Sequence, residues 1–127
     1  YVYKKTKRIL VVDDEPDTNL LLKVVLENNR FKVDSFDDPI LALKNFRDNL
    51  YDLLILDIRM SQMNGIKLYQ EIRKIDKKVK VCFLTAGQSY RGAFTDIFRD
   101  LKENRFIQKP IENEELIQRI NEIISSS

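Results

Sequence analysis

The chain contains no histidine and no tryptophan, and it has only one cysteine among its 127 residues. Without histidine, zinc sites built on imidazole ligands and catalytic triads with a histidine base are excluded. The single Cys82 rules out a disulfide within the chain, and its place in the apolar run VKVCFL is typical of a small buried side chain. Any acid or base chemistry must therefore use carboxylates, lysine or water.

Long hydrophobic runs and a strong net charge are also missing. No apolar stretch approaches the roughly 20 residues of a membrane span, and no signal-peptide pattern opens the chain. Lys and Arg number 22 against 20 for Asp and Glu, so a net charge of +2 gives no strong overall attraction to nucleic acid or to an acidic membrane. We expect a cytoplasmic protein without membrane contact.

The remaining composition is that of one folded domain. Hydrophobic residues make up 43% and charged residues 33%, which is typical of a globular chain, and 127 residues suffice for one core but not for two. We assign 1–127 to a single domain, with 1–7 as an N-terminal extension and 125–127 as a terminus or the start of a linker. The basic run KKTKR falls largely in this extension, and we interpret it as a solvated segment.

Short apolar runs alternate with longer segments of helical period. The pattern predicts strands at about 8–12, 31–36, 53–56, 79–84 and 106–108, and helices at about 16–28, 39–47, 66–75, 93–101 and 112–124. The helix at 93–101 has the least regular pattern. Five βα units in a row predict an α/β fold in which helices cover both faces of a parallel sheet.

Polar residues stand just after four of the predicted strands. Asp13 follows ILVV, Asp57 follows LLIL, Thr85 follows VCFL and Lys109 follows FIQ, while Asp14 adds negative charge. Parallel strands end at the same edge of a sheet, and ligands of open α/β sheets bind at that edge. The sequence therefore predicts a site that combines carboxylates, a hydroxyl and an ammonium group.

Such a group of carboxylates favours phosphoryl chemistry with a metal ion. Clustered carboxylates are best tolerated when a cation neutralises them, and Mg²⁺ is typically held by one or two carboxylates, water and phosphate oxygens. Asp13, Asp14 and Asp57 are the predicted ligands. Asp57 can act as a nucleophile that forms an aspartyl phosphate, while Lys109 neutralises one phosphoryl oxygen and Thr85 donates a hydrogen bond to another.

Each of these residues also has a simpler interpretation. An Asp at a strand end is often only the N-cap of the next helix, which applies to Asp13 and Asp14 taken singly. Lys109 alone reads as a surface lysine, although the following Pro110 permits a cis peptide bond that would aim its ammonium across the edge. The coincidence of four strand ends argues against these simpler interpretations together.

Four segments, ILVVDDEP, DLLILDIRMSQMNG, VCFLTAG and FIQKP, give the chain a resemblance to a known family. The sequence resembles the receiver domain of two-component response regulators over essentially its whole length. The resemblance implies a flavodoxin-like (βα)5 three-layer sandwich with a five-stranded parallel sheet in the order 2-1-3-4-5.

The same resemblance implies roles for the site residues and a partner. Asp57 would be the phosphoacceptor, Asp13 and Asp14 the acidic pair for Mg²⁺, with the Arg59 backbone carbonyl as a further ligand. Lys109 would contact the phosphoryl group, and Thr85 and Phe106 would form the conformational switch. A histidine kinase or histidine phosphotransfer protein would donate the phosphoryl group, and the output would pass through the fourth helix, fifth strand and fifth helix, where self-association is possible. Nucleic acid would be a partner only through a further effector domain.

The chain also departs from the family pattern. Ser61 and Asn64 stand where the family often has Pro and Asp, and Phe106 replaces a frequent Tyr. Thr85 and Lys109 are 24 positions apart, somewhat more than usual, and the segment KENR replaces the small residues expected before the fifth strand. From these differences we expect an intact phosphorylation site and an unusual signalling face.

Two other functions fit parts of the pattern. A magnesium phosphatase of the haloacid dehalogenase type also uses an Asp nucleophile, but carries it in a DxD arrangement on the first strand, where this chain has DDE. A receiver-like module that signals by binding alone would keep the fold without phosphorylation. Flavin binding is disfavoured because an acidic edge repels the cofactor phosphate. We expect a phosphoacceptor rather than a classified enzyme.

Overall fold

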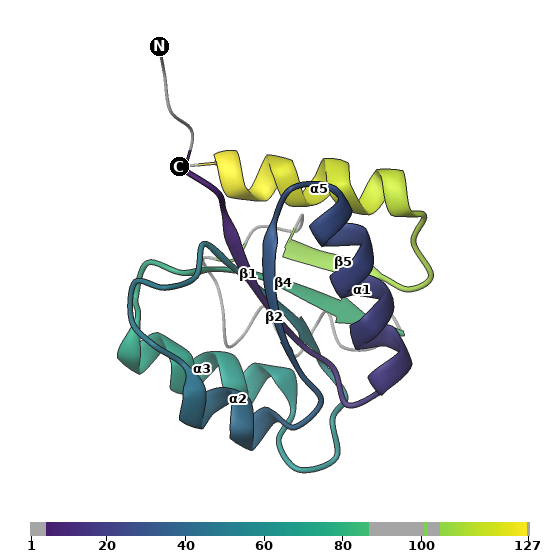
Figure 1. Cartoon of the computed structure of the whole chain (residues 1–127). Coiled ribbons are helices and arrows are strands. Elements are labelled where there is room, and N and C mark those ends of the chain that lie inside the picture. The colour runs from purple at the N-terminus through teal and green to yellow at the C-terminus, as the bar shows by residue number, and fades with distance from the viewer. Residues whose placement is uncertain (1–4, 87–100, 102–104, 127) are drawn as a thin grey trace.

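A five-stranded parallel sheet forms the centre of the molecule (Figure 1). The computed structural model describes residues 5–86, 101 and 105–126. The strands are β1 (Arg8–Val12), β2 (Lys32–Phe36), β3 (Leu53–Asp57), β4 (Lys80–Thr85) and β5 (Phe106–Gln108). They lie in the order β2-β1-β3-β4-β5, and every neighbouring pair is parallel, which confirms the predicted α/β topology.

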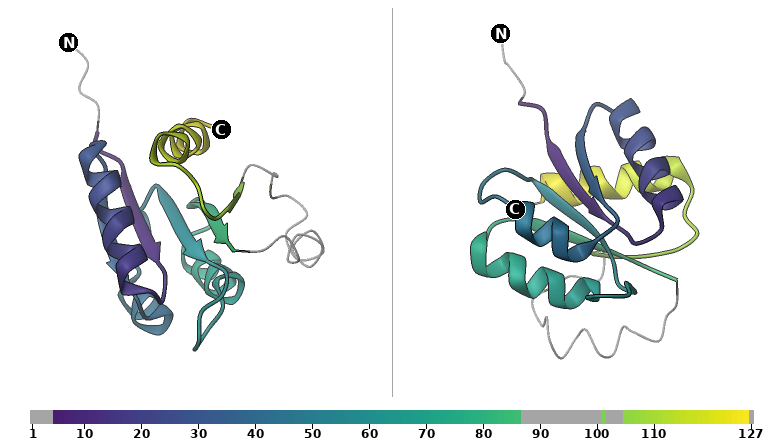
Figure 2. Two further views of the ribbon diagram at one scale, coloured as in Figure 1. Left: turned by 90° about the vertical axis from the view of Figure 1, so that its right-hand side faces the viewer. Right: turned by 60° about the horizontal axis from the view of Figure 1, so that its bottom comes forward.

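The described helices pack on both faces of this sheet (Figure 2). They are α1 (Pro16–Asn28), α2 (Pro39–Asn45), α3 (Gly65–Ile75) and α5 (Asn113–Ser125). The helix predicted at 93–101 lies outside the described residues, apart from Leu101. No helix in the described part of the chain has the length and apolar character needed to cross a membrane.

Alternate residues of each central strand enter two separate hydrophobic clusters. In β3, Leu54 and Leu56 join the side chains of α2 and α3, whereas Leu53 and Ile55 join those of α1 and α5. All five residues of β3 are buried, because side chains alternate across a strand and helices cover both faces. This three-layer packing holds the end of β3 at the centre of the sheet edge.

Local capping explains where two of the helices begin. The Asp38 carboxylate accepts a hydrogen bond from the backbone N–H of Ile40 at 2.8 Å at the start of α2, and the Asn64 side chain accepts one from Lys67 at 2.8 Å at the start of α3. Both are side-chain N-caps that pair backbone donors without a partner inside the helix. These two caps thus fix the residues at which α2 and α3 begin.

Helix α2 is shorter than predicted and ends at Asn45 rather than near residue 47. Phe46 adopts an extended conformation, and its buried ring stacks on Tyr51 with 5.6 Å between ring centroids. Burying the ring against Tyr51 requires the chain to leave the helix here. A contact with a residue beyond the helix therefore sets the boundary.

The opposite, amino edge of the sheet is fixed by polar contacts. The buried Asp76 carboxylate accepts hydrogen bonds from the backbone N–H groups of Asn49, Lys78 and Val79, which joins two loops. At the start of β4, the Lys80 ammonium donates to the backbone carbonyls of Ile124 and Ser126 at the end of α5. These contacts attach the loops and the last helix to the sheet.

A matched pair of leucine truncations on α1 tests this packing. Leu26 is fully buried, whereas 58% of Leu21 is exposed. We expect Leu26→Ala to lower the free energy of unfolding by about 2–5 kcal/mol, because it leaves a cavity against the sheet. Leu21→Ala should change it by less than about 1 kcal/mol. Urea unfolding of both variants measures the difference, and equal losses would contradict the assigned helix orientation.

Candidate functional site

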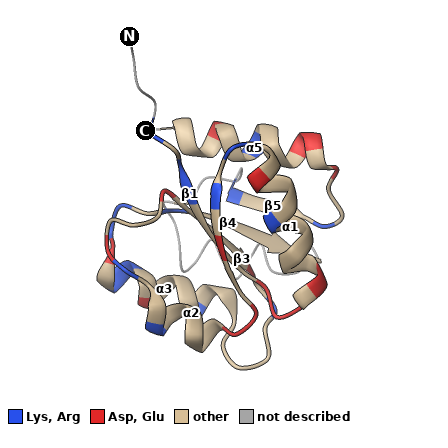
Figure 3. Ribbon diagram, in the orientation of Figure 1, with Lys and Arg blue, Asp and Glu red and all other residues tan. Residues whose placement is uncertain are grey.

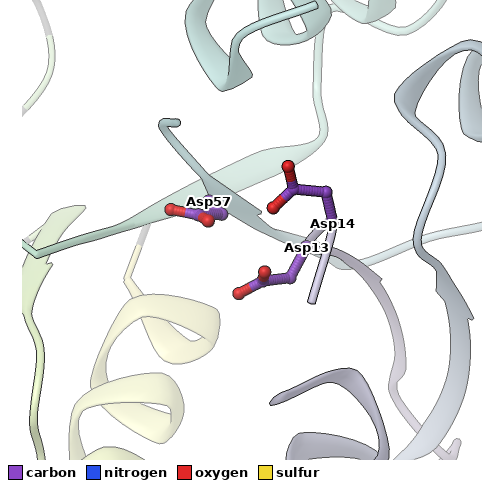
Figure 4. Close-up of side chains that lie close together, drawn as sticks. All are labelled: Asp13, Asp14 and Asp57. Carbon is purple, nitrogen blue, oxygen red and sulfur yellow. The ribbon is translucent and has the colours of Figure 1, made fainter. Parts of the chain in front are cut away.

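Three carboxylates meet at the carboxyl edge of the sheet (Figure 4). Val12 of β1 is paired with Leu56 of β3, so the next residues, Asp13 and Asp57, lie beside each other. Asp13, Asp14 and Asp57 each offer an oxygen atom, and these atoms all lie within 4.8 Å of one another. The predicted convergence of strand ends therefore occurs, and this set of hard oxygen donors could hold a metal ion.

Asp13 is the most enclosed of the three carboxylates, with 1% of its surface exposed. Its Oδ1 accepts a hydrogen bond from the Glu15 backbone N–H at 3.0 Å. The N-cap position of α1 is Glu15, and no side chain makes a capping hydrogen bond there. The simpler interpretation of Asp13 and Asp14 as N-caps is therefore wrong.

Lys109 reaches this carboxylate cluster from the end of β5. Its backbone N–H donates to the Thr85 carbonyl at 2.8 Å, and the Lys109–Pro110 peptide bond is cis. The Lys109 ammonium lies 3.0 Å from Asp13 Oδ2 and 3.8 Å from Asp57 Oδ2. Lys109 is thus an inward-facing lysine, and the interpretation as an ordinary surface residue is wrong.

The charges of the site do not balance. With Asp13, Asp14 and Asp57 ionised, three negative charges meet the one positive charge of the Lys109 ammonium, which is an excess of two negative charges among these four described residues. Figure 3 shows further acidic residues where β1 runs into α1 and where β2 runs into α2. A divalent cation matches both the charge and the donor atoms of the site.

Asp57 is the carboxylate most affected by this environment. Burial raises the pKa of the Asp57 carboxyl from 3.8 to about 6, and repulsion from Asp13 adds to the shift. Attraction to Lys109 and a hydrogen bond from the Arg59 main chain act in the opposite direction. At neutral pH most of the Asp57 carboxyl is therefore ionised, at a cost in free energy that a cation would reduce.

Loop 58–64, which follows Asp57, contributes contacts on the other side of the cluster. The Ser61 backbone N–H donates to Asp14 Oδ2 at 3.2 Å, across 47 residues of sequence. A cavity of about 410 Å³ opens beside Asp14, Arg59 and Asn64. The Arg59 main chain donates a hydrogen bond to the Asp57 carboxyl, and its carbonyl is the further metal ligand that the family resemblance implies.

Thr85 and Phe106 lie on the two strands beyond β3. Asp57 pairs in register with Leu84, so the buried Thr85 follows at the same sheet edge, and Thr85 itself pairs with Gln108. The half-buried Phe106 ring stacks on Phe83 with 5.5 Å between centroids and 17° between ring planes. Thr85 therefore lies at the site, whereas the Phe106 ring packs against Phe83, on the face of β4 that joins the cluster with α2 and α3.

Two residues with close contacts to the site were not predicted from the sequence. Asn19 on α1 donates hydrogen bonds to the backbone carbonyls of Asp13 and Phe36. Asn19 lies three positions before Leu22 and seven before Leu26, which places it on the same buried face of α1. A polar amide on this apolar face is the sequence feature that could have indicated its contacts. The second residue is Gly65, which stands directly before the helix predicted at 66–75 and is the first residue of α3.

Gly65 is required by a close approach of two backbones. A Cβ atom at this position would lie 2.2 Å from the Asp57 carbonyl oxygen and 3.0 Å from its carbonyl carbon. The Gly65 N–H also donates to the Ile58 carbonyl at 2.9 Å. Any larger residue would therefore push against the backbone of Asp57 itself.

Comparison with known proteins identifies the family. The family model described as response regulator receiver domain matches residues 9–121. The chain belongs to this family. Receiver domains of two-component response regulators interact with histidine kinases or phosphotransfer proteins, and the haloacid dehalogenase alternative is accordingly set aside.

Relatives of this receiver domain include longer regulators. It is 34% identical over 122 residues to a transcriptional regulatory protein CpxR homolog of Haemophilus influenzae, a match that covers 94% of this chain and 51% of the relative. It is 31% identical over 119 residues to the transcriptional regulatory protein RprY of Bacteroides fragilis, covering 92% and 49%. The chain thus spans about half the length of these curated relatives.

Solved structures of receivers share the fold. The response regulator TrrA of Thermotoga maritima, solved in complex with Mg²⁺-BeF, has a TM-score of 0.78 and 35% identity, with 93% of this chain and 99% of that chain covered. The non-phosphorylated HemR receiver domain of Leptospira biflexa has a TM-score of 0.84 and 30% identity, with coverages of 96% and 97%.

The raised pKa of Asp57 predicts a pH-dependent effect of Asp57→Asn. A carboxyl whose pKa is higher in the folded state favours folding below about pH 4, and this contribution is lost as the pH rises through about 6. We expect the variant to be more stable than the wild type at pH 7, by an amount on the order of 1 kcal/mol. This advantage should shrink towards pH 4. Urea unfolding across this range measures it, and a variant that is less stable at pH 7 would contradict the strained carboxylate.

Gly65→Ala tests the contact between α3 and Asp57. At an unhindered helix position this change would stabilise the protein by roughly 0.5–1 kcal/mol. Here the clash with the Asp57 carbonyl should instead cost about 1–3 kcal/mol. Thermal unfolding compares the variant with Ser61→Ala, an exposed position in the loop before α3 that should have little effect. A stabilised Gly65→Ala would show that the Asp57 backbone can move away freely.

Proposed function

We propose that this receiver domain accepts a phosphoryl group on Asp57 in a Mg²⁺-dependent reaction and then switches conformation to control a downstream output. The phosphodonor would be a histidine kinase or a histidine phosphotransfer protein. The observation that carries the proposal is the excess of two negative charges where Asp13, Asp14 and Asp57 meet Lys109. The chain would act as a phosphoacceptor that assists its own phosphorylation and dephosphorylation, not as a classified enzyme.

The donor atoms of the site suit Mg²⁺. Asp13, Asp14, Asp57 and the Arg59 backbone carbonyl would hold the ion, which prefers oxygen ligands and keeps several waters. When bound, Mg²⁺ would neutralise charge on the phosphoryl oxygens. The solved TrrA complex with Mg²⁺-BeF supports this assignment by similarity.

Each protein group has a defined part in the transfer. An ionised Oδ of Asp57 would form a bond to phosphorus while the bond between phosphorus and the donor atom breaks, with the electron pair leaving on the donor. The Lys109 ammonium, 3.8 Å from Asp57 Oδ2, is close enough to pair with a phosphoryl oxygen after a small movement. Thr85, at the neighbouring strand end, would donate its hydroxyl hydrogen to another oxygen. Charge neutralisation and alignment account for most of the catalysis in such a transfer.

The switch would involve Thr85 and Phe106. Movement of Thr85 towards the phosphoryl group would leave space beside β4, and the Phe106 ring, which already stacks on Phe83, could then move further inward. The output surface would combine β5 and α5 with the predicted fourth helix, and it would also serve any self-association. Residues 1–127 would belong to one receiver domain, with 1–7 as an N-terminal extension and 125–127 as a terminus or the start of a linker, in a cytoplasmic protein.

Exposed apolar residues on α1 support a protein as the phosphodonor. Leu20, Leu21 and Val24 are 63%, 58% and 47% exposed, on the helix that starts two residues after Asp14. Neighbouring exposed apolar side chains of this size are typical of protein contact surfaces. Apolar packing of a partner against α1 would bring its phosphoryl group to the acidic edge.

The proposal predicts that a small phosphodonor such as acetyl phosphate will add one phosphoryl group to the chain when Mg²⁺ is present. Asp57→Asn should abolish this labelling, because the amide cannot act as the nucleophile. Intact-mass measurement detects the added group. Chelation of Mg²⁺ should also remove it from the wild type.

Asp37→Asn provides the matched control, since Asp37 is an exposed aspartate at the end of β2. This variant should be labelled like the wild type. An unchanged wild-type mass, under conditions that label another receiver, would instead favour a module that signals by binding without phosphorylation.

A further inference from the structure

Asn19 is a buried polar residue that the proposed phosphoryl transfer does not use. It is the fourth residue of α1, and only 5% of its surface is exposed. Its amide Nδ2 donates to the Asp13 carbonyl at 2.5 Å and to the Phe36 carbonyl at 3.0 Å. Asn19 thus joins the ends of β1 and β2 to the helix between them in sequence.

The side-chain oxygen of Asn19 makes this residue costly to bury. Within the described part of the chain, its buried Oδ1 has no hydrogen-bonding partner. Burying an amide oxygen without a partner is unfavourable, and Leu22 and Leu26 occupy the same face of the helix. An apolar side chain would avoid this cost but would remove the Asn19 donor from the Asp13 carbonyl, so the benefit of asparagine lies in its two donor hydrogens.

The shorter of the two hydrogen bonds connects Asn19 to the acidic pair. The carbonyl of Asp13 belongs to the rigid peptide plane that continues into the backbone N of Asp14. Holding this oxygen fixes the orientation of the plane, and with it the directions in which both side chains leave the backbone. One amide therefore controls both members of the acidic pair.

The other polar atoms of Asp13 are held as well. Its N–H donates to the Phe36 carbonyl at 3.2 Å, Oδ1 accepts from the Glu15 N–H at 3.0 Å, and Oδ2 lies 3.0 Å from the Lys109 ammonium. A cation that binds Asp13 must compete with Lys109, so the carboxylate is not kept in place by that ion pair alone. The Asn19 side chain donates to the backbone carbonyl of Asp13, so this hydrogen bond is retained when the Asp13 carboxylate changes its partner.

We propose that Asn19 is a positioning residue that orients the Asp13–Asp14 peptide so that both carboxylates face the cation. The inference rests on the proposed Mg²⁺ site and extends it to a residue that does not touch the ion. Groups that orient metal ligands in this way commonly change metal affinity by a factor of ten or more when removed.

The test uses Mg²⁺ as the probe and its binding as the readout. Asn19→Leu keeps the size of the side chain but removes both donors, and we expect its dissociation constant for Mg²⁺ to rise about tenfold. Titration of backbone amide signals by NMR measures the constant for wild type and variant without phosphorylation. If Asn19→Leu does not fold, Asn19→Ser takes its place, because its hydroxyl is too short to reach both carbonyls.

Two controls separate positioning from general loosening of the fold. Asn45→Leu makes the same change at an exposed asparagine of α2 and should leave Mg²⁺ binding unchanged. Leu26→Ala loosens the packing of α1 without touching Asp13 and should also leave the dissociation constant within about twofold of the wild type.

The possible results lead to different conclusions. Unchanged Mg²⁺ binding in Asn19→Leu, or equal weakening in Leu26→Ala, would overturn the positioning role while the proposed function stands. A wild type that does not bind Mg²⁺ would overturn the metal site of the proposed function together with this inference. A loss confined to the Asn19 variants would support both.

Discussion

The site depends on the ammonium of Lys109 between the carboxylates of Asp13 and Asp57. Two carboxylates this enclosed repel each other and have lost most of their hydration, so their proximity needs a compensating charge. Lys109 supplies half of the charge that the buried pair requires. Lys109 therefore neutralises only part of the negative charge of these carboxylates, and a further cation could neutralise the rest.

The two hydrophobic clusters make this strained arrangement possible. Each central strand contributes alternate residues to both, so the sheet is fixed from two sides and the ends of β1, β3 and β4 cannot separate. The close contact of Gly65 with the Asp57 carbonyl adds a constraint on the backbone itself. The free energy gained by burying Leu, Ile and Val side chains thus supports polar groups that would otherwise move apart.

Much of this arrangement could be predicted from the sequence because the signals are local. Apolar runs of strand length predicted five strands within one or two residues of their final bounds, and Asp13, Asp57 and Lys109 were identified because each stands at the end of an apolar run. What could not be predicted depends on partners far along the chain. Helix α2 ends where the Phe46 ring packs on Tyr51, and the buried Asn19 amide donates to the Phe36 carbonyl, 17 positions away along the chain. Gly65 is needed only because the backbone of Asp57 passes beside it, which no pattern of residue types reveals.

The contacts of Lys80 have a mechanical consequence for the last helix. β4 carries Thr85 at one end and Lys80 at the other, and Lys80 is bonded to the final carbonyls of α5. A strand of this length spans about 20 Å and is nearly inextensible. The C-terminal end of α5 therefore cannot slide along β4 without breaking these hydrogen bonds. This end of the helix is thus attached to the strand at the sheet edge opposite the acidic site.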